Sequence, residues 1–357
     1  MGKVKVAIVG VGNCSSALIQ GVHYYKDANK DEFVPGLLHA DFGGYHIKDI
    51  TFVAAFDIDS RKVGTDLSNA IYSKPNNTRT FYNVPNLNVD VDKGPPLDGV
   101  GKYVKDVIKI DPNQKPVDVA KVLRDSEAEV VVNYLPVGSD KATQWYAQQA
   151  IDAGCAFVNC IPSFIASEPK WQKKFVEANL PVAGDDVMSQ VGATVVHKTL
   201  IKLLVDRGAV IDESYQLNIG GDTDFQNMID EERLASKRKS KTSAVEALVP
   251  YKVPLHIGPS DFVPFLKNTK IMYVWIKGRY FGNTPFKMDV KLEVLDSPNS
   301  GGIVIDAIRA TKLGLDRGIS GPLVSISAYA FKHPPSQQPY TIAKQWVEMF
   351  IECKRDR

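Results

Sequence analysis

The sequence has little of what would set it apart from ordinary soluble proteins. Its four cysteines among 357 residues are too few and too scattered for a disulfide framework, and no two have the C-x-x-C spacing of a zinc site. No run approaches the roughly 18 apolar residues of a membrane-spanning helix. The N-terminus leads directly into a strand-like segment instead of a signal peptide. We therefore expect a cytoplasmic protein.

The chain also lacks an excess of charge of either sign. It has 43 Lys and Arg against 41 Asp and Glu, for a formal net charge of +2. Such a balance creates no general field that attracts nucleic acid or an anionic membrane, so any anion binding must be local. The length exceeds what one hydrophobic core usually supports, which indicates two domains or one large enzyme-sized unit.

Short apolar runs alternate with helical segments over the first half of the chain. Strands are predicted at 4–9, 50–57, 129–134, 156–159 and 180–184. Helices are predicted from residue 13 and at 61–72, 140–153 and 168–178. A polar insertion covers 26–48, and the Pro, Asn, Asp and Gly of 75–101 indicate a loop. This alternation is typical of an α/β fold with a doubly wound parallel sheet.

After residue 190 the pattern changes. We expect helices at about 190–207, 224–241, 299–316 and 340–354, and strands near 214–219, 271–280 and 287–295. Alternating polar and apolar residues in these strands predict a sheet with one buried and one wet face. The predicted division is a Rossmann domain of 1–190 plus 299–357 and a second α+β domain of 191–298.

A glycine-rich turn follows the first strand. Gly10 permits a tight turn, and Gly12 lets the backbone approach a pyrophosphate. The next helix begins around Asn13 and Cys14, and its N-terminal amides and dipole favour an anion. Ser15 replaces the third glycine of the dinucleotide fingerprint, which is the most replaceable one. A glycine turn without a ligand is the simpler alternative, but the strand, the helix and the acid described next argue against it.

Asp57 ends the second strand, where a carboxylate accepts hydrogen bonds from the adenosine ribose. An acid there repels a 2′-phosphate, so the sequence favours NAD over NADP. It lies farther from the glycines than is usual, and the 26–48 insertion accounts for the excess. A later strand end, the segment 133–139, should line the same crevice, and it carries Asn133, Pro136, Gly138 and Ser139.

Two later segments concentrate unusual polar residues. In the first, Ser189 and the Gly192-Ala193-Thr194 run precede a helix and are placed to hold a phosphate, although an ordinary helix cap would look similar. The second contains Asn218 and Asp224, and then Lys237 and Lys241 at i, i+4 on one helical face. A lysine run is often a solvated face, but its position beside a second candidate anion site favours a functional role.

These segments resemble the myo-inositol-1-phosphate synthase family, particularly its shorter archaeal and bacterial branch. The similarity extends over nearly the whole chain and includes motifs at 34–37, 41–46, 54–59, 75–78, 184–186 with Ser189, 236–242 and 296–300. The resemblance implies conversion of D-glucose 6-phosphate to 1L-myo-inositol 1-phosphate, a step toward inositol and its phospholipids. The substrate would be oxidised at C5 by NAD, enolised at C6, closed by an intramolecular aldol reaction and reduced again by the NADH formed.

The resemblance also implies roles for individual residues. Lys237 would move the proton and contact the C5 oxygen, Lys241 and Lys332 would stabilise carbonyl or enolate oxygen, and Lys270 would help to hold the phosphate. Asp186 and Asp224 would orient lysines and substrate hydroxyls, with Asn218 beside them. The remaining cofactor-binding residues that it implies are Asn76, Asn77, Thr78, Asp185 and Asp296. A homotetramer is implied as well, with 191–298 as the domain for catalysis and oligomerisation.

Two departures from the family pattern change the local charge. Met188 stands where the family usually has lysine, and Asp222 where it has asparagine, a change of two charge units beside an anion site. Two alternatives therefore stay open: a relative that acts on another sugar phosphate or on none, and a simple NAD-dependent sugar dehydrogenase. The metal requirement is also open, because the aspartate-rich turns could hold a divalent or monovalent cation weakly although no His or Cys ligand cluster exists.

Overall fold

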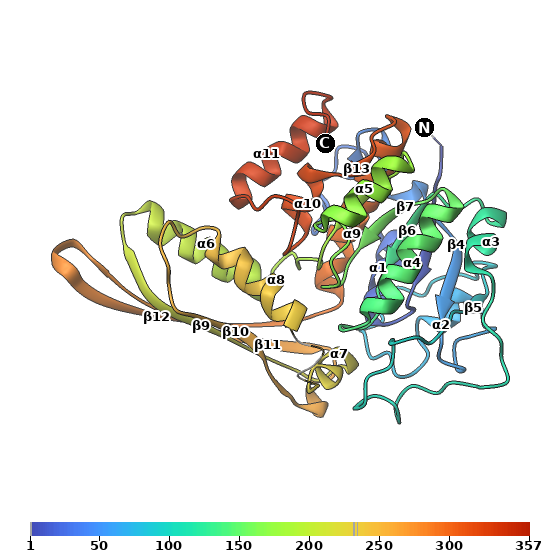
Figure 1. Ribbon diagram of the computed structural model, residues 1–357, viewed down its shortest axis with the longest axis horizontal. Helices are drawn as coiled ribbons and strands as arrows, with labels where there is room; N and C mark the ends of the chain where they lie inside the picture. The colour runs from blue at the N-terminus through green and yellow to red at the C-terminus, as the bar shows by residue number, and fades with distance from the viewer. Residues whose placement is uncertain (1, 231–232, 234) are drawn as a thin grey trace.

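The computed structural model describes residues 2–230, 233 and 235–357, with the side chains of 235–239, 241, 259 and 260 outside the described residues. Two main sheets, each with helices packed against it, lie side by side (Figure 1). The larger sheet contains β1 (Val4–Val9), β4 (Ile50–Asp57), β5 (Val91–Lys93), β6 (Val130–Asn133), β7 (Ala156–Asn159), β8 (Pro181–Gly184) and β13 (Gly321–Pro322). A small hairpin, β2 (Asp41–Phe42) and β3 (Tyr45–His46), belongs to the insertion.

The larger sheet has the order β13-β8-β7-β6-β1-β4-β5, and its neighbouring strands pair in parallel. Its strands are nearly continuous apolar runs because both faces are covered. In β1, Val4, Val6 and Ile8 belong to one core cluster, and Ala7 and Val9 belong to the other. The strand order reverses direction at β1, so the turns after β1 and β6 border one crevice at the carboxyl edge.

Helices cover both faces of this sheet. One face carries α1 (Asn13–Tyr24), α9 (Pro298–Asp316), α10 (Val324–Ala330) and α11 (Tyr340–Ile351). The other face carries α3 (Val119–Asp125), α4 (Asp140–Ala153) and α5 (Pro169–Glu177). Among the described residues no helix is long and apolar enough to cross a membrane. The predicted doubly wound α/β fold is confirmed.

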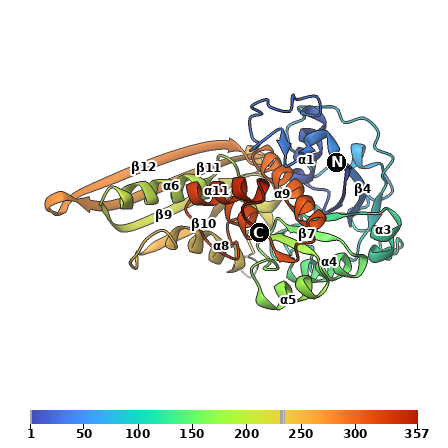
Figure 2. The same cartoon turned by 90° about the horizontal axis from the view of Figure 1, so that it is seen from above.

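The second sheet has the order β10-β9-β11-β12. Its strands are β9 (Val210–Gly220), β10 (Leu255–Phe262), β11 (Thr269–Tyr280) and β12 (Thr284–Leu295). Figure 2 shows β11 and β12 reaching far from the larger sheet, with α6 (Ala193–Asp206) and α8 (Ala235–Glu246) lying along the same sheet. Met272, Val274 and Ile276 are buried whereas the intervening Tyr273 is 39% exposed, which confirms the predicted alternation.

Several predicted elements differ from the structure. The helix predicted at 61–72 is only α2 (Leu67–Ala70), because Gly64 has a φ of +79° and Asp66 caps a new helix through the Ser68 amide. The predicted helix at 224–241 is instead α7 (Thr223–Asn227) followed by α8. β5 lies inside the predicted loop, and α3, β10, β13 and α10 have no counterpart in the prediction. Short 3-10 turns occupy Ile47–Asp49, Pro264–Leu266 and Phe281–Asn283.

A buried ion pair on α9 anchors the 26–48 insertion. Arg309 is fully buried and pairs with Asp306, and its guanidinium also donates to the carbonyls of Ala40 (2.8 Å) and His39 (2.8 Å). The Asp306 carboxylate accepts from the Leu38 amide at 2.8 Å, and burial raises the pKa of Asp306 to about 6. The pair therefore satisfies polar backbone groups that the insertion brings against the sheet.

Replacing Arg309 with Met should lower the free energy of unfolding by about 3–5 kcal/mol, because it leaves the Asp306 charge and several carbonyls buried without a partner. Urea denaturation of the two proteins measures the difference. Arg279→Met is the matched control, since Arg279 pairs with Asp212 at the surface with nearly half of its side chain exposed and should cost under about 1 kcal/mol. Equal losses in both variants would contradict this assignment.

Candidate active site

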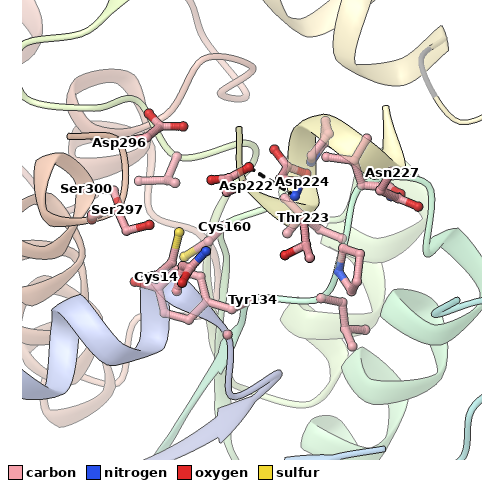
Figure 3. A pocket seen from close by; sticks show the side chains of 18 of the residues that line it. Cys14, Tyr134, Cys160, Asp222, Thr223, Asp224, Asn227, Asp296, Ser297 and Ser300 are labelled. Carbon is pink, nitrogen blue, oxygen red and sulfur yellow. Dashed lines mark hydrogen bonds between the residues drawn. The ribbon is translucent and has the colours of Figure 1, made fainter. Parts of the chain in front are cut away.

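Two neighbouring pockets open at the carboxyl edge of the parallel sheet. The first pocket is lined by the turn after β1, the ends of β6 and β7, residues 186–189, α7, the start of β11 and the 296–300 turn. The second pocket lies beside it, between the same glycine turn, the end of β4 and the 95–100 loop. Figure 3 shows Asp296, Ser297 and Ser300 on one side of the first pocket and Asp222 and Asp224 on the other.

The glycine turn has the shape that an anion-binding turn requires. Gly10 has a φ of +90°, and a Cβ there would lie 2.7 Å from the Tyr134 carbonyl oxygen, so a side chain is excluded. A Cβ at Gly12 would meet nothing within 4 Å, and Gly12 lines both pockets. No side chain caps the first amides of α1. The turn therefore leaves room and donors for a phosphate group.

The 76–78 loop is bound directly to this turn. The Asn13 side-chain oxygen accepts from the amides of Asn77 (2.7 Å) and Thr78 (3.1 Å). Asn76 donates to the Val11 carbonyl at 3.1 Å and lines the second pocket. Asn77 and Thr78 thus support the turn through Asn13, while Asn76 reaches the pocket. Ser15 donates to the Gly10 carbonyl, and so it serves the turn internally.

Asp57 is the last residue of β4, the strand predicted at 50–57, and it lies in the second pocket. One carboxylate oxygen accepts from the Val11 amide at 2.8 Å, and the other accepts from the Ile58 and Asp59 amides. The pocket walls around it are mostly apolar and include Pro95, Pro96, Ile58, Ile108 and Tyr146. A flat aromatic base beside a hydroxyl-bearing sugar suits these surroundings.

The strand-end segment 133–139 enters the pockets only in part. Pro136 lines both pockets. Asn133 is fully buried and donates to Asn159 (2.9 Å), and Ser139 is a buried residue at the start of α4. Gly138 has a φ of +80°, and a Cβ there would lie 2.6 Å from the Arg233 side chain. None of Asn133, Gly138 and Ser139 lines either pocket, so their contact with a cofactor stays a prediction.

Asp185 also lies apart from both pockets. Its buried carboxylate accepts from the amides of Ile165, Ala166 and Ser167, each at 3.0 Å, and from Asn159 at 2.7 Å. Burial raises the pKa of Asp185 to about 6. These contacts hold the loop that precedes α5, and the carboxylate is buried in the protein interior. They show a structural role for Asp185, and its contact with a cofactor stays a prediction.

Lys332 and Asp186 form one ion pair in the lining of the first pocket. The Lys332 ammonium lies 2.8 Å from Asp186 and donates to the Val187 carbonyl at 2.7 Å. The other Asp186 oxygen accepts from the Ser240 hydroxyl at 2.6 Å. Ser240 belongs to α8, so this bond ties the lysine-bearing helix to the pocket. Lys237 and Lys241 lie on α8 three residues before and one residue after Ser240, and their side chains are outside the described residues.

Lys270 and Asp296 form a second ion pair in the pocket, with the ammonium 3.0 Å from the carboxylate. Asp224 and Asp222 line the same pocket. Burial and the charges of Asp224 and Asp296 raise the pKa of Asp222 to about 7. The same pocket raises the pKa of the Cys14 thiol to about 12, first through burial and then through Asp296 and Asp222. The thiol is therefore protonated at neutral pH.

Of the residues predicted to hold a phosphate, Ser189 lines the first pocket and the others lie near it at the start of α6. Ser189 lines the first pocket, and Gly192 begins α6 so close by that a Cβ would lie 2.8 Å from the Ser189 Cβ. Ala193 and Thr194 are buried in the first turn of α6. Asn218 lies in β9, where it donates to the Gly258 carbonyl at 2.7 Å, and it is not a lining residue of either pocket.

Sequence reasoning missed some of the lining residues. Cys160 stands at the carboxyl end of β7, and the rule that such ends border the crevice would have found it. Tyr134, at the end of β6, belongs to the strand-end segment 133–139 that was predicted to line the crevice. Ser297 and Ser300 accompany Asp296, which was predicted. Lys62, in the second pocket, carries no recognisable motif. Within the described chain no group of three or more His, Cys, Asp or Glu side chains is arranged to hold a metal ion.

Replacing Asp222 with Asn should make unfolding less dependent on pH. Because folding raises the pKa of Asp222 from 3.8 to about 7, its stabilising contribution is present below about pH 4 and is lost as the pH rises through about 7. Asparagine keeps the cap on α7 and should increase the free energy of unfolding at pH 8, on the order of 1 kcal/mol, with a smaller gain at pH 5.

Urea denaturation at the two pH values tests this expectation. Asp31→Asn is the matched control, since Asp31 is exposed and its replacement should change neither value. A gain from Asp222→Asn that is the same at both pH values would contradict the assigned titration.

Comparison with known proteins gives the site a family. The family model described as myo-inositol-1-phosphate synthase matches residues 192–297. The chain is 52% identical to the inositol-3-phosphate synthase of Mycolicibacterium smegmatis, and the alignment covers 98% of each chain. It is 51% identical to the inositol-3-phosphate synthase of Corynebacterium glutamicum, again over 98% of each chain.

The fold agrees with that of a solved relative. The structure of a myo-inositol-1-phosphate synthase-related protein from Thermotoga maritima superposes on this one with a TM-score of 0.81, and the alignment covers 98% of each chain. Because the two sequences are only 24% identical, this similarity shows the fold alone. The high identity over nearly the full length of the two bacterial enzymes decides the family. The chain belongs to the myo-inositol-1-phosphate synthase family.

Proposed function

We propose that the chain is an inositol-3-phosphate synthase, an isomerase that converts D-glucose 6-phosphate into 1L-myo-inositol 1-phosphate with NAD as a resident cofactor. The observation that carries this proposal is that Gly12 of the anion-binding turn lines the same pocket as Lys270 and Lys332. A dinucleotide on the turn would thus lie beside two cations. A simple dehydrogenase has no evident use for that cluster.

The residues of both pockets fit NAD. The space over Gly12 and the uncapped start of α1 suit the pyrophosphate, and Asp57 and Asn76 in the second pocket suit the adenosine. When bound, NAD supplies reversible hydride transfer at the substrate C5. The remaining steps belong to the side chains of the chain itself.

Those side chains have to bind the substrate, move a proton and stabilise oxyanions. We assign to Lys332, held by Asp186, the stabilisation of a developing enolate oxygen together with Lys241. We assign the proton transfer and the C5 oxygen to Lys237. Ammonium groups suit these steps because they are compact charges whose pKa falls when other cations are near. Asp224, in the first turn of α7, would orient substrate hydroxyls.

The substrate phosphate is assigned to Ser189, Lys270 and the first turn of α6. Gly192 provides no side-chain cap there, so the amides of Ala193 and Thr194 remain candidates for anion binding. In this arrangement the phosphate anchors one end of the sugar while C5 and C6 lie near Lys332. Asn218 lines neither pocket, so it would act indirectly, by supporting β9, the strand to which it belongs.

The finer features of the proposal concern organisation. We propose the division into 1–190 plus 299–357 and 191–298, supported by the packing of α9, α10 and α11 on the larger sheet. A homotetramer in the cytoplasm is also proposed. The sheet face that carries Tyr215 and Tyr273, 36% and 39% exposed, supports assembly through the second sheet.

Incubation with glucose 6-phosphate and NAD should yield inositol phosphate without net NADH. Phosphorus NMR measures the product, and the absorbance of NADH measures its accumulation. A dehydrogenase would accumulate NADH, and a relative with another substrate would form neither. Absence of inositol phosphate under varied conditions, added divalent cations included, would contradict the proposal.

Lys237→Ala should lower kcat by at least about 100-fold, since it removes the proposed proton-transfer group. The dissociation constant for NAD, measured by calorimetry, should stay unchanged. Lys252→Ala is the control, because Lys252 is an exposed lysine just after the same helix and its loss should leave kcat as it is. Loss of NAD binding in Lys237→Ala would show that this lysine contacts the cofactor instead.

A further inference from the structure

One buried ammonium group in the second pocket has no part in the proposed reaction. Lys62 is 3% exposed, follows β4 and lines the pocket together with Asp57. Its Nζ donates to the Val11 carbonyl at 2.6 Å and to the Asn76 side-chain oxygen at 3.1 Å. A lysine that is almost fully buried is unusual, and it needs both hydrogen-bond partners and an opposing charge.

That opposing charge is Asp57, whose carboxylate lies 3.7 Å from the Lys62 ammonium. The distance makes an ion pair but is too long for a hydrogen bond. An ammonium has three donors, and the Val11 and Asn76 oxygens take two of them. Among the described residues only these two oxygens accept from the ammonium, so its third donor is available to a ligand that approaches Asp57.

Asp57 and Lys62 should affect the binding of NAD and of NADP differently. The ribose hydroxyl of NAD is neutral and suits a carboxylate acceptor, whereas the 2′-phosphate of NADP is repelled by Asp57 and attracted by Lys62. The neighbouring cation, Arg61, is already held by Asp59 and donates to the Val107 carbonyl at 2.7 Å. Lys62 is thus the cation of this segment that lines the pocket.

We propose that Lys62 is a specificity-determining residue whose attraction for a 2′-phosphate is masked by Asp57. The inference rests on the proposed binding of NAD. Neutralising Asp57 should therefore turn the site toward NADP, and the gain should require Lys62. A purely structural role of Lys62, as a support of the Val11 turn, would instead change the affinities for NAD and NADP alike.

Calorimetric titration with NAD and NADP tests the proposal on the purified full-length protein. Asp57→Asn should increase the affinity for NADP relative to NAD by roughly tenfold or more, the effect of a hydrogen bond to a charged group. Asp57→Asn combined with Lys62→Met should remove that gain. Asp57→Asn combined with Arg61→Met is the matched control and should keep it. Asp57→Ser provides a second neutral variant if the asparagine variant folds poorly.

The outcomes separate this inference from the proposed function. If the natural protein binds neither dinucleotide, the proposed function fails and the inference fails with it. If NAD binds but Asp57→Asn and Asp57→Ser gain no NADP affinity, only the inference is overturned. A gain that survives Lys62→Met, or that is lost with Arg61→Met, also overturns it, since another cation would then hold the phosphate.

Discussion

The buried carboxylate of Asp186 joins three segments that are far apart in the sequence. It pairs with Lys332, accepts from Ser240 on α8 and follows β8 at the carboxyl edge of the larger sheet. Because one carboxylate has two oxygens and here uses both, the distance between the Lys332 segment and α8 is limited to the span of a single side chain. The two halves of the first pocket, and with them the position of α8, depend on this contact.

The electrostatic balance of the first pocket follows from its burial. Lys270 and Lys332 are each paired with an aspartate, so the pocket presents cations without leaving them uncompensated. Burial and the neighbouring aspartates raise the pKa of Asp222 to about 7, so this carboxyl group is only partly charged at neutral pH. The negative charge that Asp222 brings to the pocket is thus smaller than the formal charge suggests, while Met188 is buried and contributes no charge.

Much of the fold could be predicted because its elements are defined by local patterns. β1 and β7 are buried apolar runs, and α4 begins and ends where its sequence predicts. Elsewhere the conformation is decided either by single residues that interrupt a pattern or by contacts from outside the segment. Gly64 and Asp66 end one helical pattern and begin another. Asp185 looked like its pocket-lining neighbour Asp186, but its carboxylate is bound by the 165–167 amides.

The sequence by itself determined the parallel sheet, the glycine turn with Asp57 at the next strand end, and the identities of the lysines and aspartates. These features depend on residue type and on short spacing, which the chain carries in linear order. The tertiary structure alone decided which of them meet: Lys332 with Asp186, Lys270 with Asp296, and Lys62 with Asp57. Side chains distant in sequence acquire their partners and their desolvation only when the sheets pack together, and it is this packing that sets their chemistry.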